Sequence, residues 1–193
     1  IHNTDKTQLF WAPVVGWNKY NKFMAGAAFY NNVLPEKKLE YVFMPMYAFG
    51  NKDLAGGASV NYNMHFDNVF QTIRLGVDAS RYTFDNSELP NVNFNKLAPQ
   101  VEIEFRKKHP RRALKHSIRL RQVCMWKEFA VRDMNLVTPT YSYDTTNINI
   151  NDFTYLISNK RKIDPYTVSL NFQGGEGMMK TSLTATYEMT LKK

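Results

Sequence analysis

Residues 54–66 read Leu-Ala-Gly-Gly-Ala-Ser-Val-Asn-Tyr-Asn-Met-His-Phe, and their polarity alternates with a period of two. One alternate set is apolar or small: Leu54, Gly56, Ala58, Val60, Tyr62, Met64 and Phe66. The other set is small or polar: Gly57, Ser59, Asn61, Asn63 and His65. Because successive side chains of an extended chain point to opposite sides, this stretch predicts a β-strand with one apolar and one polar face.

The same alternation recurs along most of the chain, and helical periodicity is almost absent. It is clear in residues 97–107, 166–173 and 182–191, and weaker in residues 9–15, 23–30, 39–49, 69–84, 114–130 and 149–158. Short polar stretches of the kind that close hairpins separate the strands: residues 16–19, 31–38, 50–53, 67–68, 107–112 and 174–177. Residues 85–95 and 144–147 read as longer loops. Connections this short exclude crossover helices, so neighbouring strands should be antiparallel.

One hairpin allows a check of the register. If the chain folds about residues 107–112 with paired residue numbers summing to 219, Glu104 lies opposite Lys115, and Val101 lies opposite Ile118. Apolar residues then face each other on one side of the hairpin, and opposite charges face each other on the other side. The sequence therefore predicts an all-β fold, an antiparallel up-and-down meander of about ten strands within a single domain of residues 1–193.

Composition excludes several classes of protein. The chain of 193 residues has a net charge of +8, and its hydrophobic content of 44% argues against wholesale disorder. Its single cysteine excludes an internal disulfide. The mean hydropathy is −0.45 and the longest apolar stretch, residues 41–49, contains a proline. A transmembrane helix is therefore excluded, but a transmembrane β-strand needs only about 9–11 residues.

A single apolar face per strand fits two kinds of barrel. A soluble barrel points this face inward, whereas an outer-membrane barrel points it at lipid and fills its lumen with polar groups. Some strand patterns span 11–13 residues, which is the length a tilted membrane strand needs. Aromatic residues gather towards the strand ends, as in interfacial girdles. Both features favour a transmembrane β-barrel, either closed or incomplete.

Several motifs add a family resemblance: PVVGWNKYNKFMAG at residues 13–26, MPMY at 44–47, GNKDLAG at 50–56, KLAPQ at 96–100 and FRKK at 105–108. Together with Asn31-Asn32 and PEKK at 35–38, they resemble the outer-membrane β-barrel region that follows an aminopeptidase-N-like zinc metallopeptidase (gluzincin) domain in some Gram-negative bacteria. The resemblance spans residues 9–107 well and the remainder loosely. These motifs form strands and turns and carry no catalytic signature.

The resemblance implies a location in the outer membrane of a Gram-negative bacterium, with outer-membrane lipid and the protein's own upstream domain as partners. It implies zinc only in that upstream domain, and no cofactor in this chain. The chain has no His-Glu-x-x-His, so no peptidase residue is carried over to it. Because it starts at Ile1 without a signal segment and stops within an alternating pattern, we expect a fragment of a longer barrel whose direct role is anchoring.

No catalytic or metal site is predicted in this chain, so we identify no enzyme activity in it. Its histidines have no ligand spacing, and Cys124 reads as a packing residue with no base partner. The charged residues predict two other sites. The first is a lumenal ion-pair network of Glu102, Glu104, Lys115, Arg119 and Arg121. The second is a set of lipid-phosphate contacts at Lys107, Lys108, Arg111 and Arg112.

Two alternatives remain open at this stage. A soluble lipocalin-like β-barrel would bind an apolar ligand in its interior, with Val60, Tyr62, Ile103 and Phe105 lining the cavity. A basic β domain could instead bind nucleic acid through the cluster at residues 106–112, which would make binding strongly salt-dependent. Nucleic acid is the less expected partner.

Overall fold

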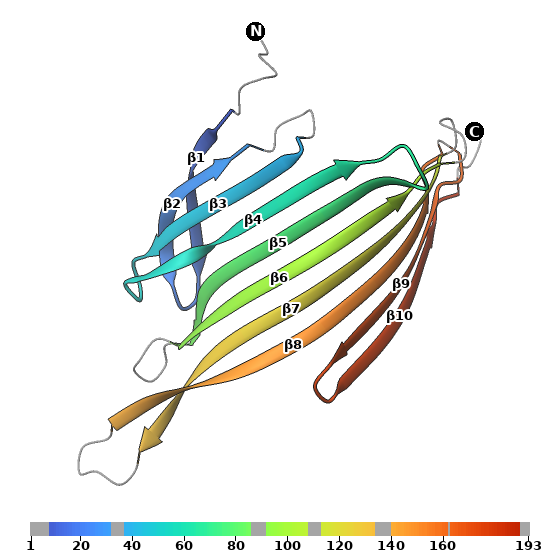
Figure 1. The fold of residues 1–193 in the computed structure, drawn as a ribbon. Helices are drawn as coiled ribbons and strands as arrows, with labels where there is room; N and C mark the ends of the chain where they lie inside the picture. The colour runs from blue at the N-terminus through green and yellow to red at the C-terminus, as the bar shows by residue number, and fades with distance from the viewer. Residues whose placement is uncertain are drawn as a thin grey trace. The chain divides into compact units, whose positions relative to one another are not determined.

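The computed structural model describes residues 8–31, 37–85, 92–107, 113–133, 140–161 and 163–189. These residues form ten β-strands and no helix: β1 (Phe10–Asn18), β2 (Lys22–Tyr30), β3 (Leu39–Ala48), β4 (Asp53–His65), β5 (Phe70–Asp85), β6 (Val92–Phe105), β7 (Leu114–Asp133), β8 (Thr140–Asn159), β9 (Tyr166–Gly175) and β10 (Met178–Tyr187). The strands form one open antiparallel sheet in sequence order (Figure 1). The predicted all-β, up-and-down meander of about ten strands is confirmed.

Residue contacts divide the chain into two compact units. Unit 1 comprises residues 1–61, 77–98 and 124–148, and unit 2 comprises residues 62–76, 99–123 and 149–193. Strands β4 to β8 each contribute to both units. Each unit is described separately below.

Unit 1 contains the hairpins of β1 to β3. Strand β1 pairs with β2 from Phe10↔Tyr30 to Asn18↔Lys22, so β1 continues through Trp17. The predicted turn at residues 16–19 is therefore wrong by about three positions. The side chain of Asn18 explains the shift, because its Oδ1 accepts hydrogen bonds from the backbone N–H groups of Tyr20 (3.0 Å) and Asn21 (2.6 Å) and so closes the turn there.

A proline lies inside β3, a strand with neighbours on both sides. Strand β2 pairs with β3 at Gly26↔Met46 and again at Phe29↔Phe43, and the pairing is interrupted between them, next to Pro45, which has no N–H to donate. A Cβ on Gly26 would overlap the carbonyl oxygen of Pro45, and a Cβ on Gly56 in β4 would overlap that of Met44. Gly56 also has φ +144°. Glycine on both neighbouring strands lets the three backbones approach closely here.

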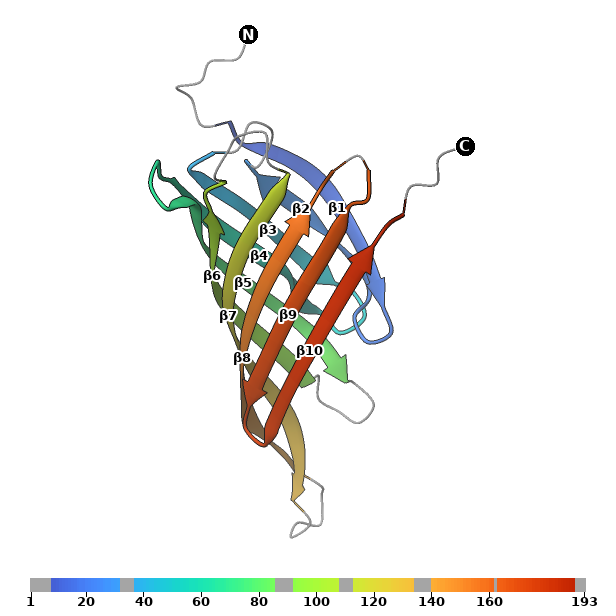
Figure 2. The ribbon, with the colours of Figure 1, turned by 90° about the vertical axis from the view of Figure 1, so that its right-hand side faces the viewer.

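Unit 2 contains the hairpin of β9 and β10, drawn side by side in Figure 2. These strands pair from Tyr166↔Tyr187 to Gly175↔Met178, and Gly177 supplies the left-handed conformation (φ 71°) at the turn. On the other side, β9 pairs with β8 from Ile150↔Gly175 to Asn159↔Tyr166.

Both predicted long loops overlap strands. The loop predicted at residues 85–95 is too long, because β5 ends at Asp85 and β6 starts at Val92. The loop predicted at residues 144–147 is wrong throughout. Residues 144–147 lie inside β8, which starts at Thr140, and the stretch between β7 and β8 is residues 134–139, outside the described residues. Ser142 Oγ donates a hydrogen bond to Val131 O of β7 at 3.5 Å. The sequence of residues 140–147 contains asparagine and aspartate, which suggest a turn, but also β-branched threonines and tyrosines that favour strands once a partner strand is available.

In β1 and β4 one face of the strand is more covered than the other, and the exposed face carries the large apolar side chains. In β1 the exposed residues include Trp11, Val15 and Trp17, and Trp17 is 71% exposed. In β4 Tyr62 is 44% exposed, whereas its neighbour Asn63 is 1% exposed. The largest fully buried side chains among the described residues are asparagines: Asn21, Asn31 and Asn63.

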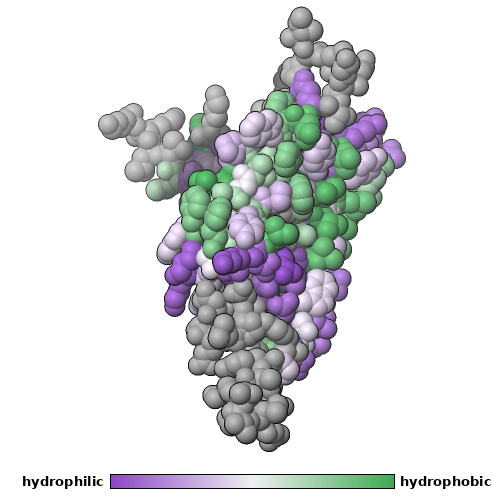
Figure 3. Space-filling model, turned by 90° about the vertical axis from the view of Figure 1, so that its left-hand side faces the viewer, coloured by the Kyte–Doolittle hydropathy of each residue, from purple (hydrophilic) through white to green (hydrophobic). Residues whose placement is uncertain are grey.

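The covered face of unit 1 has a small apolar core. It consists of Met24, Met46, Ala48 and Ala55, with Val14 and Tyr82 packed against them. Large apolar side chains lie instead on the opposite face, where Phe23 stacks on Phe49 at 5.8 Å and Tyr47 meets Phe49 edge-on at 5.3 Å. Figure 3 shows hydrophobic residues gathered over the middle of the viewed face, with a band of hydrophilic residues below them and further hydrophilic residues at the right-hand edge.

Candidate functional site

The predicted ion-pair network lies in unit 2, on β6 and β7. Lys115 Nζ is 2.6 Å from Glu104 Oε2, so these two residues face each other as the predicted register requires. Their side chains are 36% and 19% exposed, so solvent screens the pair. Glu104 is therefore paired with a cation from the neighbouring strand.

The partner of Glu102 comes from a strand outside the predicted network. Arg74 of β5 places its Nη1 3.8 Å from Glu102 Oε2, and its Nε donates a 2.8 Å hydrogen bond to Asn63 Oδ1 of β4. Arg74 thus joins β4 to β6 through polar side chains. Arg74 lies in the weakly alternating stretch 69–84, and only the pairing of three strands shows which carboxylate it meets.

Arg119 and Arg121 lie on β7, in the same alternate set as Lys115. Arg119 is exposed and Arg121 is half-buried. The structure therefore brings Glu104 and Lys115 into direct contact and places the two arginines farther along the same strand.

A second polar cluster in unit 2 was not predicted. Asp152 of β8 accepts hydrogen bonds from Asn171 Nδ2 (2.6 Å), Thr154 Oγ1 (3.2 Å) and Gln173 Nε2 (3.4 Å). Asn171 and Gln173 belong to the polar face that alternation predicts for β9. Asp152 was not predicted to belong to this cluster, because the alternation of its strand in the sequence is too weak to assign it to a face.

Unit 1 has its own polar network, centred on Asp53. Its Oδ2 accepts hydrogen bonds from Arg81 Nη2 and Asn93 Nδ2, both at 3.2 Å, and its Oδ1 accepts one from Leu54 N at 2.7 Å. Asn93 Oδ1 in turn accepts a 2.7 Å hydrogen bond from Thr83 Oγ1. Since Thr83 and Asn93 are buried, these bonds satisfy polar groups that would otherwise be costly to cover.

The predicted lipid-phosphate contacts fall mostly outside the described residues. Lys108, Arg111 and Arg112 lie in the undescribed stretch 108–112, and Lys107, directly before it, is half-buried.

One histidine, His116 of β7, contacts Tyr155 of β8. His116 Nδ1 is 3.0 Å from Tyr155 Oη, and the two rings stack with centroids 6.3 Å apart. Cys124 is half-buried with a free thiol. The described residues contain no group of three or more His, Cys, Asp or Glu side chains that could hold a metal ion. They also include no helix of the length and apolarity that crossing a membrane requires.

A charge exchange tests the Glu104–Lys115 contact. We expect the single variant Lys115→Glu to lower the free energy of unfolding by about 1 kcal/mol, because it places two carboxylates together, and Glu104→Lys in the same chain to restore most of the loss. Denaturant titration of the wild type, both single variants and the double variant measures this coupling. Additive effects of the two substitutions would contradict the pairing.

These side chains form ion pairs and hydrogen-bond ladders that join neighbouring strands, and they present no arrangement of nucleophile and base. The functional feature that the structure does present is the distribution of polarity between its two faces. Comparison of the chain with models of known protein families, with curated proteins and with solved structures finds no match.

Proposed function

We propose that this chain is a segment of an outer-membrane β-barrel that anchors a larger protein. The observation that carries the proposal is the reversed burial of the strands. Trp11 and Trp17 of β1 and Leu183 of β10 are about 70% exposed, whereas Asn63 of β4 is 1% exposed. Asn21 and Asn31, which flank β2, are at most 2% exposed. Water would penalise so many exposed large apolar side chains, whereas lipid would cover them.

The polar networks support the same proposal. In lipid every buried polar group must find a partner within the protein, and a closed barrel satisfies this for strand backbones. The covered faces carry Asn63–Arg74–Glu102 and Glu104–Lys115 in unit 2 and the buried Thr83–Asn93 hydrogen bond in unit 1. Such side chains are typical of a barrel lumen, in which ion pairs and amides bond across neighbouring strands.

The arrangement at one end of the first hairpins is typical of a membrane interface. The aromatic residues Trp17, Phe23, Tyr47 and Phe49 lie beside the turns at residues 19–21 and 49–52, which contain Lys19, Lys22 and Lys52 at or near their bends. The two turns are adjacent, since Gly50 N donates a 3.1 Å hydrogen bond to Asn21 O. Aromatic rings favour the headgroup level, and lysines favour its phosphates.

The identity of the anchored protein rests on the sequence motifs alone. We propose that an upstream zinc metallopeptidase domain precedes this segment in a Gram-negative bacterium, and that the segment itself carries no catalytic residue. The sequence that encodes the residues before Ile1 tests this directly. A His-Glu-x-x-His motif there supports the proposal, and an unrelated upstream domain contradicts it.

The lipocalin-like alternative fits the exposure of its proposed lining less well. It requires Val60 and Tyr62 to line an enclosed interior, yet they are 45% and 44% exposed, on the side opposite to buried Asn63. The nucleic-acid alternative depends on the cluster at residues 106–112, of which only Arg106 and Lys107 are described.

Refolding in different solvents tests the anchoring role. We expect the unfolded chain to acquire cooperative β-structure on dilution into detergent micelles or lipid vesicles, and to aggregate on dilution into plain buffer, because buffer leaves the apolar face exposed. Circular dichroism, gel filtration and heat-dependent gel mobility measure the outcome. Monodisperse, cooperatively folded protein in detergent-free buffer would contradict the proposal.

A further inference from the structure

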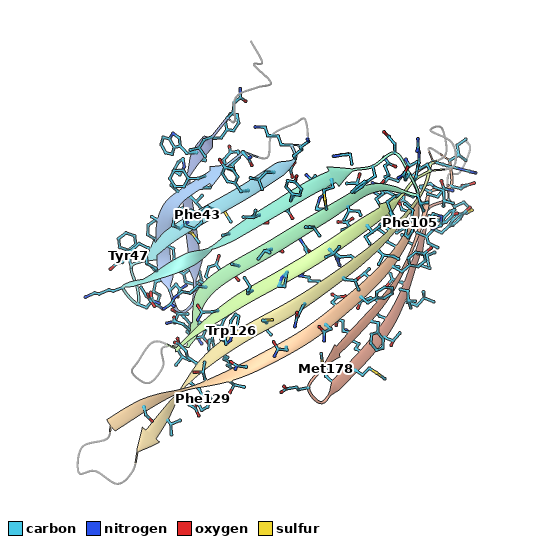
Figure 4. The ribbon with its side chains drawn as sticks, in the orientation of Figure 1. Phe43, Tyr47, Phe105, Trp126, Phe129 and Met178 are labelled. Atoms are coloured by element: carbon cyan, nitrogen blue, oxygen red, sulfur yellow. The ribbon has the colours of Figure 1, made fainter. Side chains whose placement is uncertain are left out.

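The exposed apolar face of unit 1 contains a hollow of about 440 Å³, formed by strands β3 to β7. Small residues line its floor, namely Gly56 and Ala58 of β4 and Ala79 of β5. Larger apolar side chains border it, among them Phe43 of β3 and Trp126 of β7, both labelled in Figure 4. The volume lies in the range of sites that hold small molecules.

The guanidinium of Arg81 makes this otherwise apolar hollow favourable for an anionic group. Arg81 and Lys96 are the two cationic residues among the described residues of the lining, and the Arg81 side chain is 44% exposed. Its Nη2 donates to Asp53 Oδ2 at 3.2 Å. A guanidinium has five N–H donors, more than one carboxylate oxygen can accept, so Arg81 can bind a second anion while it keeps Asp53.

We propose that this hollow binds one acyl chain of an anionic phospholipid, whose phosphate contacts Arg81. This inference rests on the proposed function, because it needs the exposed face to lie in lipid. The apolar walls suit the acyl chain, and the guanidinium at their edge suits a phosphate, which it can bind through two parallel hydrogen bonds. A free phosphate would leave the apolar walls uncovered, and a neutral apolar molecule would make no use of the positive charge of Arg81 beyond its pairing with Asp53.

The position of the small residues explains why the hollow forms in unit 1. The run Gly56-Gly57-Ala58 lies beside Ala79, since a Cβ on Gly57 would lie 3.5 Å from Ala79 O. Elsewhere on this face the strands carry Trp, Phe, Tyr, Leu and Val, which fill the surface. A larger side chain at position 58 or 79 therefore occupies the volume that we assign to the acyl chain.

Lipid retention tests the proposal. The wild type is folded in vesicles of mixed phosphatidylglycerol and phosphatidylcholine, extracted in a mild detergent, and examined by native mass spectrometry. We expect it to retain one phosphatidylglycerol. Ala58→Phe and the milder Ala79→Leu should reduce retention at least about fivefold, whereas Ala185→Phe, at an exposed position on β10 far from the lining residues in sequence, should leave it unchanged. Only protein that shows the folded gel mobility is counted.

Two substitutions with opposite expected effects on lipid preference test the headgroup contact. Arg81→Gln should reduce the preference for phosphatidylglycerol over phosphatidylcholine about tenfold, because a charge-assisted contact is lost. Asp53→Asn should increase that preference, because it removes the competing carboxylate. If both substitutions reduce it equally, Arg81 acts only through the Asp53 network and the phosphate contact is wrong.

The remaining outcomes separate this inference from the proposed function. Equal retention by the wild type, Ala58→Phe and Ala185→Phe, with all three folded in vesicles, overturns the lipid site and leaves the membrane role intact. If the wild type retains no lipid and instead forms an oligomer, the lipid site is wrong and the hollow is a contact between copies of the chain. A wild type that folds in buffer and retains no lipid overturns both proposals.

Discussion

Arginine in place of Val60 or Leu183 should destabilise the protein folded in a bilayer by roughly 2–4 kcal/mol if the side chain lies near the bilayer midplane. Near a membrane interface the destabilisation should be smaller. The two side chains are 45% and 70% exposed and lie on the apolar faces of β4 and β10. In water the same substitutions at exposed positions change stability by only about 0.5 kcal/mol. The size of the effect therefore reports directly on what covers this face.

Thr184 provides a matched control. It is also exposed, it is one residue from Leu183 on the same edge strand, and it points to the opposite face. Thr184→Arg should cost less than about 1 kcal/mol, because the polar face is expected to be hydrated. Urea titration of folding into vesicles measures all three variants. Equal costs at positions 183 and 184, or negligible costs at both apolar positions, would contradict a lipid-covered apolar face.

The second large effect is expected at the glycines that flank Pro45. We predict that Gly26→Ala and Gly56→Ala each lower the free energy of unfolding by about 3 kcal/mol, at the upper end of overpacking costs, because the added Cβ would overlap a backbone carbonyl oxygen of β3. Backbone in the middle of a sheet cannot move aside as a flexible side chain can. At Gly56 the positive φ adds strain for any residue with a Cβ.

Gly174→Ala is the control for these substitutions. Gly174 lies in β9, and a Cβ there would be 3.8 Å from the ring of Phe172, an ordinary contact. We expect this variant to differ from the wild type by less than about 0.5 kcal/mol. Denaturant titration in the same detergent compares the three variants. If Gly26→Ala is as stable as Gly174→Ala, β2 and β3 do not approach as closely as the structure indicates.

Local sequence patterns predicted the strands but placed their ends less well. Alternation identifies each strand because side-chain direction in an extended chain is a local property with period two. Turn residues are weaker signals, since the same asparagine serves in a turn or in a strand according to its partners. Asn18 ends β1 by binding the N–H groups of Tyr20 and Asn21, whereas Asn147 continues β8.

The candidate sites likewise divide into contacts that local sequence predicts and contacts that depend on the pairing of distant strands. The contact between Glu104 and Lys115 could be predicted because it lies within one hairpin, where the turn sets the register. The contact between Arg74 and Glu102 joins β5 to β6 across residues 86–91, and turn chemistry gave no register for that pair of strands. The hollow beside Arg81 draws on five strands, so no single stretch of sequence contains it.

The sequence by itself determined that this chain forms antiparallel strands, each with one apolar and one polar face, because both properties follow from the local alternation of residues. The sequence could not determine which face is covered, since the same alternation suits a sheet with its apolar face inward and a sheet with its apolar face outward. Tertiary structure decided this by packing Asn63 to 1% exposure while leaving the adjacent Tyr62 at 44%. The reason is physical: burial depends on the curvature and partners of the whole sheet, whereas alternation depends only on neighbouring residues.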